Sequence, residues 1–439
     1  MISRACKAAI AALMLLPAVL AFSLIALYGV NVAYWDEWST VPLFEKLYTN
    51  NLTFNDFIAQ HNEHRILTYR LIVLPLGHLT HWNNVAEMYF SWVLLCLACF
   101  VLYRMFTVSN GTSWRSAALF IPVPWLLFNL RQGGNLLWGF QFPFYILVLC
   151  VVLAIYFLQF SKGLDWRFFA AVFCGIVGTF CVANGLSIWI IGTLQLAAIC
   201  ILQPAVSKGA VLRSLLVWIA VAAGIYAFYF WGYIKPSHHP SLLFFLQDPL
   251  SSLLYGFAAV GCLFSLETCT AIAIGIVIAA LYIAAFILVL KDMRNMRSQL
   301  MSLSLILFTG ASVALLVLGR SGFGINQALS NRYVTFTMIG IIGLYYIVIA
   351  MRPKFSLLKP VILNTAIVLL VVSMFSMDIY ALVLYRGPHA KRFEAQQILL
   401  TYQTQSDEKL KLLLPDPNFV KQYSPVLIKY RLNAFYDGG

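Results

Sequence analysis

Charged residues are scarce in this sequence, and their scarcity excludes a soluble globular protein. Asp, Glu, Lys and Arg make up only 10% of the 439 residues. A soluble domain needs about a quarter of its residues charged to cover its surface. Hydrophobic residues make up 62% of the chain, so most of its surface must face a solvent other than water. Lipid is the solvent that fits this composition.

Several other features are missing. The apolar runs are too long and continuous for the alternating strands of a membrane barrel. The net charge of +13 is not gathered in one soluble domain, so we expect no nucleic-acid partner. The nine cysteines all lie in or beside apolar runs without metal-ligand spacing, which is typical of small buried hydrophobic residues. Tandem repeats, low-complexity stretches and a clear second domain are also absent from the sequence.

Long apolar runs recur instead from one end of the chain to the other. About 20 apolar residues in helical form cross the hydrocarbon core, and in lipid the backbone must satisfy its own hydrogen bonds. We therefore predict an all-α polytopic transmembrane bundle with about eleven crossings. The predicted helices lie near residues 8–30, 85–106, 117–130, 142–160, 168–183, 187–202, 214–234, 268–290, 299–318, 333–351 and 360–382.

Basic residues in the short loops predict the orientation. Pairs such as Lys162 with Arg167 and Lys208 with Arg213 fall in alternate loops, and positive loops stay in the cytoplasm. We therefore expect a cytoplasmic N-terminus, with Met1 to Val30 as an uncleaved first helix. Residues 250–266 are apolar enough to cross, but a crossing there would invert the charge pattern beyond them. We interpret them as a re-entrant or interface-lying helix.

This topology divides the chain into two parts. Residues 1–383 form the transmembrane domain, whose first outer loop spans residues 31–84. Residues 384–439 form a polar, extracytoplasmic C-terminal tail with a small appended helical segment. The predicted topology places the C-terminus on the extracytoplasmic side of the membrane.

The first outer loop begins with two adjacent acids, Asp36 and Glu37, between Trp35 and Trp38. A carboxylate near a medium of low dielectric has a raised pKa, which suits a general base. The alternative is a helix cap or a solvated loop acid. Further along the loop, Ser39 to Tyr48 predicts an amphipathic helix on the membrane surface.

A dense polar cluster follows in the same loop. It contains His61, Glu63, His64 and Arg65, just before an apolar helix. Arginine binds phosphate oxygens bidentately, so the cluster fits a phosphate or pyrophosphate ligand. Metal binding by His61, Glu63 and His64, and a capped helix start with solvated charges, are the alternatives.

The other outer turns add polar groups at the same depth. Singly, each of these residues fits a topology anchor or a helix cap. Together they predict one shared site for an anionic, lipid-linked ligand, because polar groups at membrane depth are costly unless they are used. The predicted substrate-binding residues outside the first loop are Arg131, Asn135, Gln141, Lys235, His238, His239, Arg320 and Arg332.

The pattern resembles the GT-C superfamily of integral membrane glycosyltransferases, and more narrowly the bacterial and phage-borne O-antigen glucosyltransferases of serotype conversion. The similarity in topology covers the chain to about residue 382, and the similarity in motifs is local. The residues that carry the resemblance are Asp36-Glu37, Gln60-His61-Asn62-Glu63-His64-Arg65, Asn135-Leu136-Leu137-Trp138-Gly139-Phe140-Gln141 and Ser330-Asn331-Arg332-Tyr333.

The resemblance implies an inverting transfer of a sugar, such as glucose, from a polyprenyl-phosphate donor. The implied acceptor is a lipid-linked or cell-surface glycan, and membrane lipid is a further expected partner. The implied location is the outer face of the bacterial inner membrane, with the C-terminus in the periplasm. Asp36 or Glu37 is then the base, and Arg65, Arg320 or Arg332 holds the departing phosphate. Donors of this class often need no metal, so we expect no cofactor, although a divalent metal remains an alternative.

Two other functions use the same features. A transporter or flippase of a lipid-linked saccharide also needs an outer site, but transporters tend to show internal repeats and sites at mid-membrane. A membrane acyltransferase uses His61 or His64 as its base.

Overall fold

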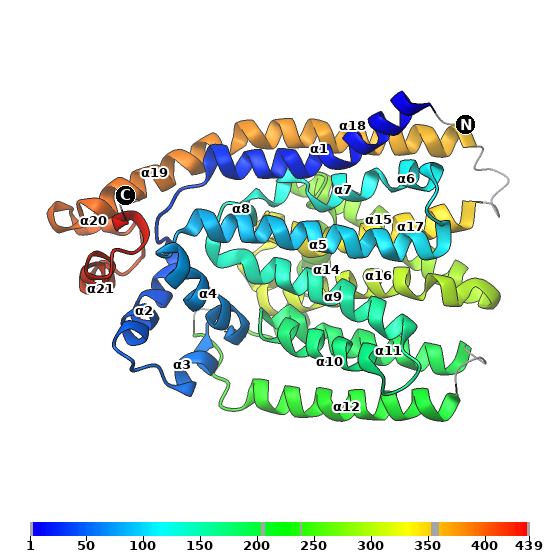
Figure 1. The fold of residues 1–439 in the computed structure, drawn as a ribbon, viewed down its shortest axis with the longest axis horizontal. Helices are drawn as coiled ribbons and strands as arrows, with labels where there is room; N and C mark the ends of the chain where they lie inside the picture. The colour runs from blue at the N-terminus through cyan, green and yellow to red at the C-terminus, as the bar shows by residue number, and fades with distance from the viewer. Residues whose placement is uncertain (1–2, 203–206, 238, 353–359, 437–439) are drawn as a thin grey trace.

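The computed structural model describes residues 3–202, 207–237, 239–352 and 360–436. Long helices run side by side through most of the molecule (Figure 1). In the described residues, the strands form one hairpin, β1 Gln60–His61 and β2 His64–Arg65. The α-helices are α1 Arg4–Tyr28, α2 Val41–Tyr48, α3 Phe54–Ile58, α4 Leu67–Thr80, α5 Asn84–Asn110, α6 Trp114–Phe120, α7 Pro122–Leu127, α8 Gly133–Leu136, α9 Phe142–Phe160, α10 Trp166–Thr179, α11 Ser187–Leu202, α12 Lys208–Phe230, α13 Phe244–Gln247, α14 Pro249–Gly261, α15 Thr268–Lys291, α16 Met293–Arg320, α17 Val334–Met351, α18 Pro360–Leu384, α19 Arg386–Leu400, α20 Asp407–Leu410 and α21 Pro417–Lys429.

Within the described ranges, nine helical segments are long and apolar enough to cross a membrane. The chain is therefore a multi-pass membrane protein, and the prediction of an all-α bundle is confirmed for these residues. The segments are Arg4–Tyr28, Asn84–Asn110, Gly139–Phe160, Ala183–Leu202, Lys208–Phe230, Thr268–Lys291, Met296–Phe323, Val334–Met351 and Val361–Leu400. The number of eleven crossings stays a prediction.

Two predicted crossings take a different form. The predicted helix 117–130 is divided into α6 and α7, which meet at Ile121. Pro122 and Pro124 follow this junction, and proline lacks the N–H that would continue the preceding helix. The predicted helix 168–183 corresponds to α10, whose 14 residues span about 21 Å, less than the hydrocarbon thickness of about 30 Å.

The ambiguous segment 250–266 forms the short helix α14. Its 13 residues extend about 20 Å, which is also less than the hydrocarbon thickness. α14 packs closely on α15 and touches the turn between α16 and α17. At this contact a Cβ on Gly275 would lie 1.8 Å from the carbonyl oxygen of Phe257, so only glycine permits such an approach. Whether α14 crosses the membrane stays a prediction.

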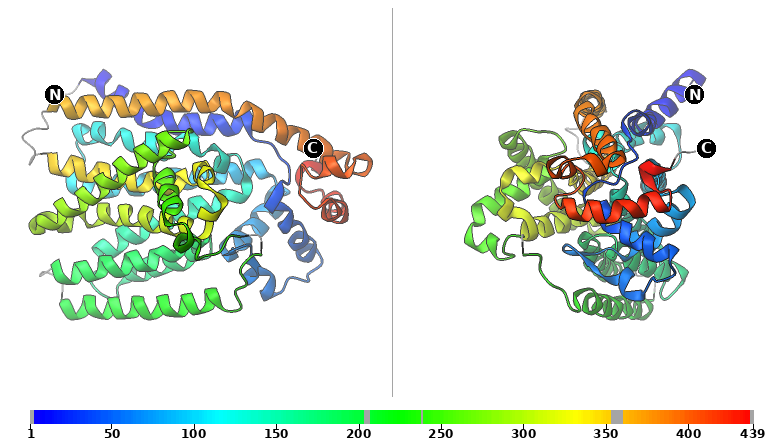
Figure 2. Two further views of the ribbon diagram at one scale, coloured as in Figure 1. Left: turned by 180° about the vertical axis from the view of Figure 1, so that it is seen from behind. Right: turned by 90° about the vertical axis from the view of Figure 1, so that its left-hand side faces the viewer.

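The first loop, residues 31–84, and the C-terminal tail, residues 384–439, lie at the same end of the bundle (Figure 1; Figure 2). α19 follows α18 beyond the bundle, and α21 packs against α2. The side chain of Asn433 accepts a hydrogen bond from the N–H of Ala33 at 2.8 Å and donates one to the carbonyl oxygen of Trp82 at 3.2 Å. The tail is therefore interlocked with both ends of the loop.

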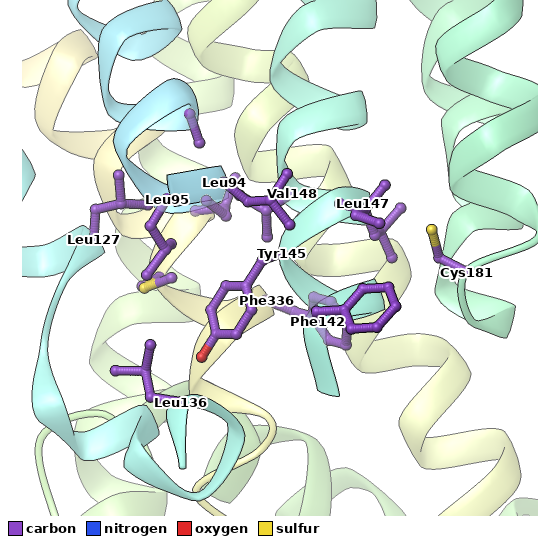
Figure 3. Packing of buried hydrophobic residues seen from close by; sticks show 14 of the residues in the cluster. Leu94, Leu95, Leu127, Leu136, Phe142, Tyr145, Leu147, Val148, Cys181 and Phe336 are labelled. Carbon is purple, nitrogen blue, oxygen red and sulfur yellow. The ribbon is translucent and has the colours of Figure 1, made fainter. Parts of the chain in front are cut away.

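The apolar core lies between the long helices of the bundle. Side chains of α5, α9 and α17, including Leu95, Tyr145 and Phe336, meet in it (Figure 3). The rings of Phe144 and Phe336 stack with their centroids 5.1 Å apart. Both residues also line a cavity at the end of the bundle, so the same packing fixes the core and the cavity wall.

Candidate functional site

The cavity has a volume of about 340 Å³ and lies where the first loop meets the ends of α9, α12, α16 and α17. Its walls come from segments far apart in the sequence, as the shared-site prediction requires. The predicted site residues that line it are Asp36, His61, Glu63, His64, Gln141, Lys235, His239, Arg320 and Arg332.

Asp36 lies in the short 3₁₀ helix Trp35–Thr40, just after α1. Its side chain is 35% exposed, and its Oδ1 lies 3.8 Å from Nε2 of His61. The carboxylate accepts no hydrogen bond from any residue that the structure describes. It is therefore free to accept a proton or a hydrogen bond from a ligand.

Glu37 is fully buried and does not line the cavity. Its Oε2 accepts the N–H of Tyr34 at 2.8 Å, and its Oε1 accepts the N–H of Phe140 at 3.1 Å. Burial raises the pKa of Glu37 to about 7, although these two N–H groups and the charge of Arg392 lower it. Glu37 ties the exit of α1 to the turn before α9, and of the two predicted bases only Asp36 lines the cavity.

A tight hairpin brings His61 and His64 together. The two residues are paired across β1 and β2, and Asn62 in the turn has the left-handed φ of 49° that asparagine tolerates. The helix begins only at Leu67. The turn of the hairpin, and not a helix, therefore brings His61 and His64 together near Asp36.

Both hairpin histidines are neutral at pH 7, because burial lowers the pKa of His61 to about 4 and that of His64 to about 4. Nδ1 of His64 accepts the N–H of Ala183 at 3.1 Å. The proton of the neutral ring is then on Nε2, which lies 3.4 Å from Oε1 of Glu63. His64 is therefore oriented as a donor toward Glu63.

Glu63 contacts an arginine and a histidine from other elements. Its Oε1 pairs with the guanidinium of Arg320, and its Oε2 lies 3.5 Å from Nε2 of His239. Nζ of Lys235 donates to the carbonyl oxygen of His239 at 3.0 Å. With the hairpin histidines neutral, the cations of the cavity outnumber its carboxylates, and such an excess favours an anionic ligand.

Arg332 supplies the unpaired part of this positive charge. Its guanidinium forms neither a hydrogen bond nor an ion pair with any side chain or carbonyl in the described part of the chain. A guanidinium carries five donors in a planar fork that matches phosphate oxygens. Arg332 is therefore available to a ligand, whereas Arg320 is shared with Glu63.

Arg65, Arg131 and Asn135 do not line the cavity. Nε of Arg65 donates to the carbonyl oxygen of Tyr229 at 2.7 Å, and its terminal nitrogens donate to the carbonyls of Ile58 and Trp231. Arg65 thus joins the first loop to the end of α12.

The other two residues support the turn between α16 and α17. Arg131 donates to the carbonyl oxygen of Leu329 at 2.9 Å. The amide of Asn135 donates to Oγ1 of Thr335 at 2.8 Å and to the carbonyl oxygen of Arg332 at 3.1 Å. These contacts hold the segment that presents Arg332. The remaining predicted residue, His238, lies outside the described residues.

Sequence reasoning did not identify the apolar wall of the cavity. Leu315, Leu316 and Leu318 of α16 line it, together with Phe230 and Leu242. An apolar residue in a spanning helix gives no sign of whether it faces lipid, core or cavity. Asn184 also lines the cavity, and the interruption of an apolar run by Asn184-Gly185 was the available signal.

Among the residues that the structure describes, no group of three or more His, Cys, Asp or Glu has the arrangement of a metal site. This geometry gives no support to the alternative in which His61, Glu63 and His64 bind a metal. No protein-family model matches the chain, and no curated protein or solved structure is significantly similar to it. The fold and the cavity define a multi-pass helical membrane protein with a charged site at one end of its bundle.

Proposed function

We propose that this protein is an inverting glycosyltransferase of the GT-C type. It transfers a sugar, in our proposal a hexose such as glucose, from a polyprenyl-phosphate donor to a lipid-linked or cell-surface glycan. The reaction takes place at the outer face of the bacterial inner membrane, with the N-terminus in the cytoplasm. The observation that carries the proposal is one cavity that is lined both by the unbonded carboxylate of Asp36 and by the unpaired guanidinium of Arg332.

The lining of the cavity supports an amphipathic donor. Asp36, Arg332 and the histidine hairpin provide a polar part, and the leucines of α16 with Phe230 provide an apolar part. An isoprenoid chain fits the apolar part, and its phosphate fits the cations. Because the cavity lies at the ends of candidate spanning helices, the phosphate of a membrane-embedded donor would lie at this depth.

The proposed step needs one base and one anion-binding group. The Asp36 carboxylate takes the proton of an acceptor hydroxyl while the hydroxyl oxygen attacks the anomeric carbon of the donor. The bond from that carbon to the phosphate oxygen breaks, and the electron pair leaves with the polyprenyl phosphate. Arg332 stabilises the charge that develops on the phosphate. Attack from the face opposite the leaving group inverts the configuration.

Sugar transfer by the reconstituted protein tests the proposal. The donor is a polyprenyl phosphate carrying radiolabelled glucose, and the acceptor is a bacterial envelope glycolipid extract. Asp36→Asn should reduce the transfer of label by about a thousand-fold, the range expected for loss of a general base. The matched control is Asp407→Asn, an exposed acid of the tail, which should transfer label normally.

Three results would overturn the proposal. Normal transfer by a well-folded Asp36→Asn variant would show that Asp36 is not the base. Movement of labelled donor across vesicles without covalent change would indicate a flippase instead. Label taken from an acyl donor and lost in His61→Gln or His64→Gln would indicate an acyltransferase.

A further inference from the structure

A row of aromatic rings leads outward from the cavity wall beside Asp36. Phe140 lines the cavity, and its ring centroid is 5.9 Å from that of Trp138. The Trp138 ring is 6.3 Å from that of Tyr34, which is 6.2 Å from that of Trp35. We call these four residues the aromatic row. It begins inside the site and ends at the surface, where Trp35 is 44% exposed.

Trp35 has an unusual backbone for an exposed residue. Its φ of 52° lies in the left-handed region, which bulky residues rarely adopt. The tail holds this conformation through a hydrogen bond of 2.8 Å from the N–H of Trp35 to the carbonyl oxygen of Leu413. Strained residues of this kind gather at functional sites. The nearby Trp38 is fully buried, so burial accounts for Trp38 and leaves the exposed ring of Trp35 unexplained.

The row also contains an unused hydrogen-bond donor. The indole Nε1–H of Trp138 is buried, and no acceptor for it exists among the described residues. Such a group in a native protein calls for an explanation. The guanidinium of Arg392 lies 5.7 Å from the centroid of the Tyr34 ring, so the middle of the row combines ring faces with donors.

The position of Asp36 links the row to the proposed reaction. The donor occupies the cavity, so the acceptor must reach the Asp36 carboxylate from outside it. Asp36 directly follows Trp35, and its side chain is 35% exposed. The inner end of the row approaches the base, because the ring of Phe140 is 5.4 Å from that of His61, whose Nε2 lies 3.8 Å from Oδ1 of Asp36. A glycan that follows the row inward from Trp35 is therefore led to the base.

Resting on the proposed function, we propose that the aromatic row is the acceptor-binding site. A pyranose ring of the acceptor glycan packs its C–H face on Trp35, because flat aromatic side chains offer apolar area with little rotamer entropy to lose. A further sugar of the same glycan, at the inner end of the row, then presents its hydroxyl to Asp36. The ligand class is a hexopyranose of a glycan, bound outside the donor cavity.

Separate titration of acceptor and donor in the transfer assay tests this site. The main variant is Trp35→Asn, because asparagine tolerates the left-handed backbone that Trp35 adopts. We expect its acceptor KM to rise about tenfold, a typical loss for one aromatic contact, with the donor KM unchanged. Trp35→Phe should recover most of the acceptor binding. Trp166→Ala is the control, since Trp166 is a more exposed tryptophan at the start of α10.

The outcomes separate this inference from the proposed function. If Asp36→Asn abolishes transfer while Trp35→Asn keeps the wild-type acceptor KM, the acceptor site is wrong and the enzyme stands. If Trp35→Asn and Trp166→Ala reduce the amount of protein in the membrane equally and neither changes the acceptor KM, Trp35 is an interface anchor, and the inference fails. If wild-type protein transfers no label, the proposed function fails with it.

Discussion

Two polar regions lie at the same end of the bundle, and their contacts differ in kind. We call the first the interlocked region. Its residues Glu37, Arg65 and Asn433 form hydrogen bonds with backbone groups at 2.7 to 2.8 Å. The second, the cavity region, contains Asp36 and Arg332. Oδ1 of Asp36 lies 3.8 Å from Nε2 of His61, and the guanidinium of Arg332 has no partner among the described residues. Side chains of the first region have used their hydrogen-bonding capacity, whereas the carboxylate of Asp36 and the guanidinium of Arg332 retain theirs. This difference separates groups that build a site from groups that serve a ligand.

Arg332 and Arg131 provide the sharpest test of that difference. Arg332→Gln should reduce sugar transfer by about a hundred-fold, the loss expected when one stabiliser of developing charge is removed. Its thermal unfolding should stay unchanged, because the guanidinium has no partner among the described residues. Arg131→Gln should instead lower the unfolding midpoint, because the carbonyl of Leu329 loses its donor. Equal behaviour of the two variants in both measurements would erase the distinction.

Arg65 should affect stability strongly, because its guanidinium donates to three backbone carbonyls. Arg65→Gln should lower the free energy of unfolding by about 3 kcal/mol, because buried carbonyls lose a charged donor. Thermal unfolding in detergent measures the effect, and Arg386→Gln is the control, since Arg386 is exposed. If Arg65→Gln unfolds at the wild-type temperature but no longer binds the donor, Arg65 contacts the ligand and belongs with the residues of the cavity region.

Asn433 tests whether the tail is needed for the first loop. Asn433→Ala should lower the free energy of unfolding by about 2 kcal/mol, because it removes the bonds to Ala33 and Trp82. The matched control is Asn418→Ala, an exposed asparagine of α21. If both variants unfold at the wild-type temperature, the loop holds its shape without the tail.

The smallest expected effect is on pH dependence, and the two regions respond in opposite directions. The pKa of His61 and of His64 falls from 6.5 to about 4 on folding. The unfolded chain therefore binds more protons, and stability is lost as the pH falls through this range. The pKa of Glu37 rises from 4.5 to about 7 on folding, so its contribution to the free energy of unfolding is stabilising at low pH and is lost as the pH rises.

Unfolding midpoints at pH 7 and pH 5 measure the contributions of the two histidines and of Glu37. The double variant His61→Gln/His64→Gln should lose less stability on acidification than the wild type. Glu37→Gln should lose more, because the contribution of its protonated form disappears. Identical shifts in all three proteins would contradict the environments described for these groups.

Much of the fold could be predicted because the relevant signals are local. Long apolar runs such as 268–290 predicted helices, and hydropathy requires no knowledge of distant contacts. A carboxylate after the first helix and polar residues in the outer turns also indicated where a site would form. The break between α6 and α7 was missed, although Pro122 and Pro124 were a local signal for it. The shortness of α10 was also missed, since an apolar run does not show where packing stops a helix.

The sequence by itself determined a helical membrane bundle with Asp36 in a polar loop, because backbone hydrogen bonding in lipid allows few alternatives. Only the tertiary structure decided that Asp36 faces the cavity while Glu37 is buried, since adjacent side chains point in different directions. It also decided that the tail holds the loop, through residues such as Ala33 and Asn433 that lie 400 positions apart. Contacts at that separation depend on how the whole chain packs, and no local pattern records them.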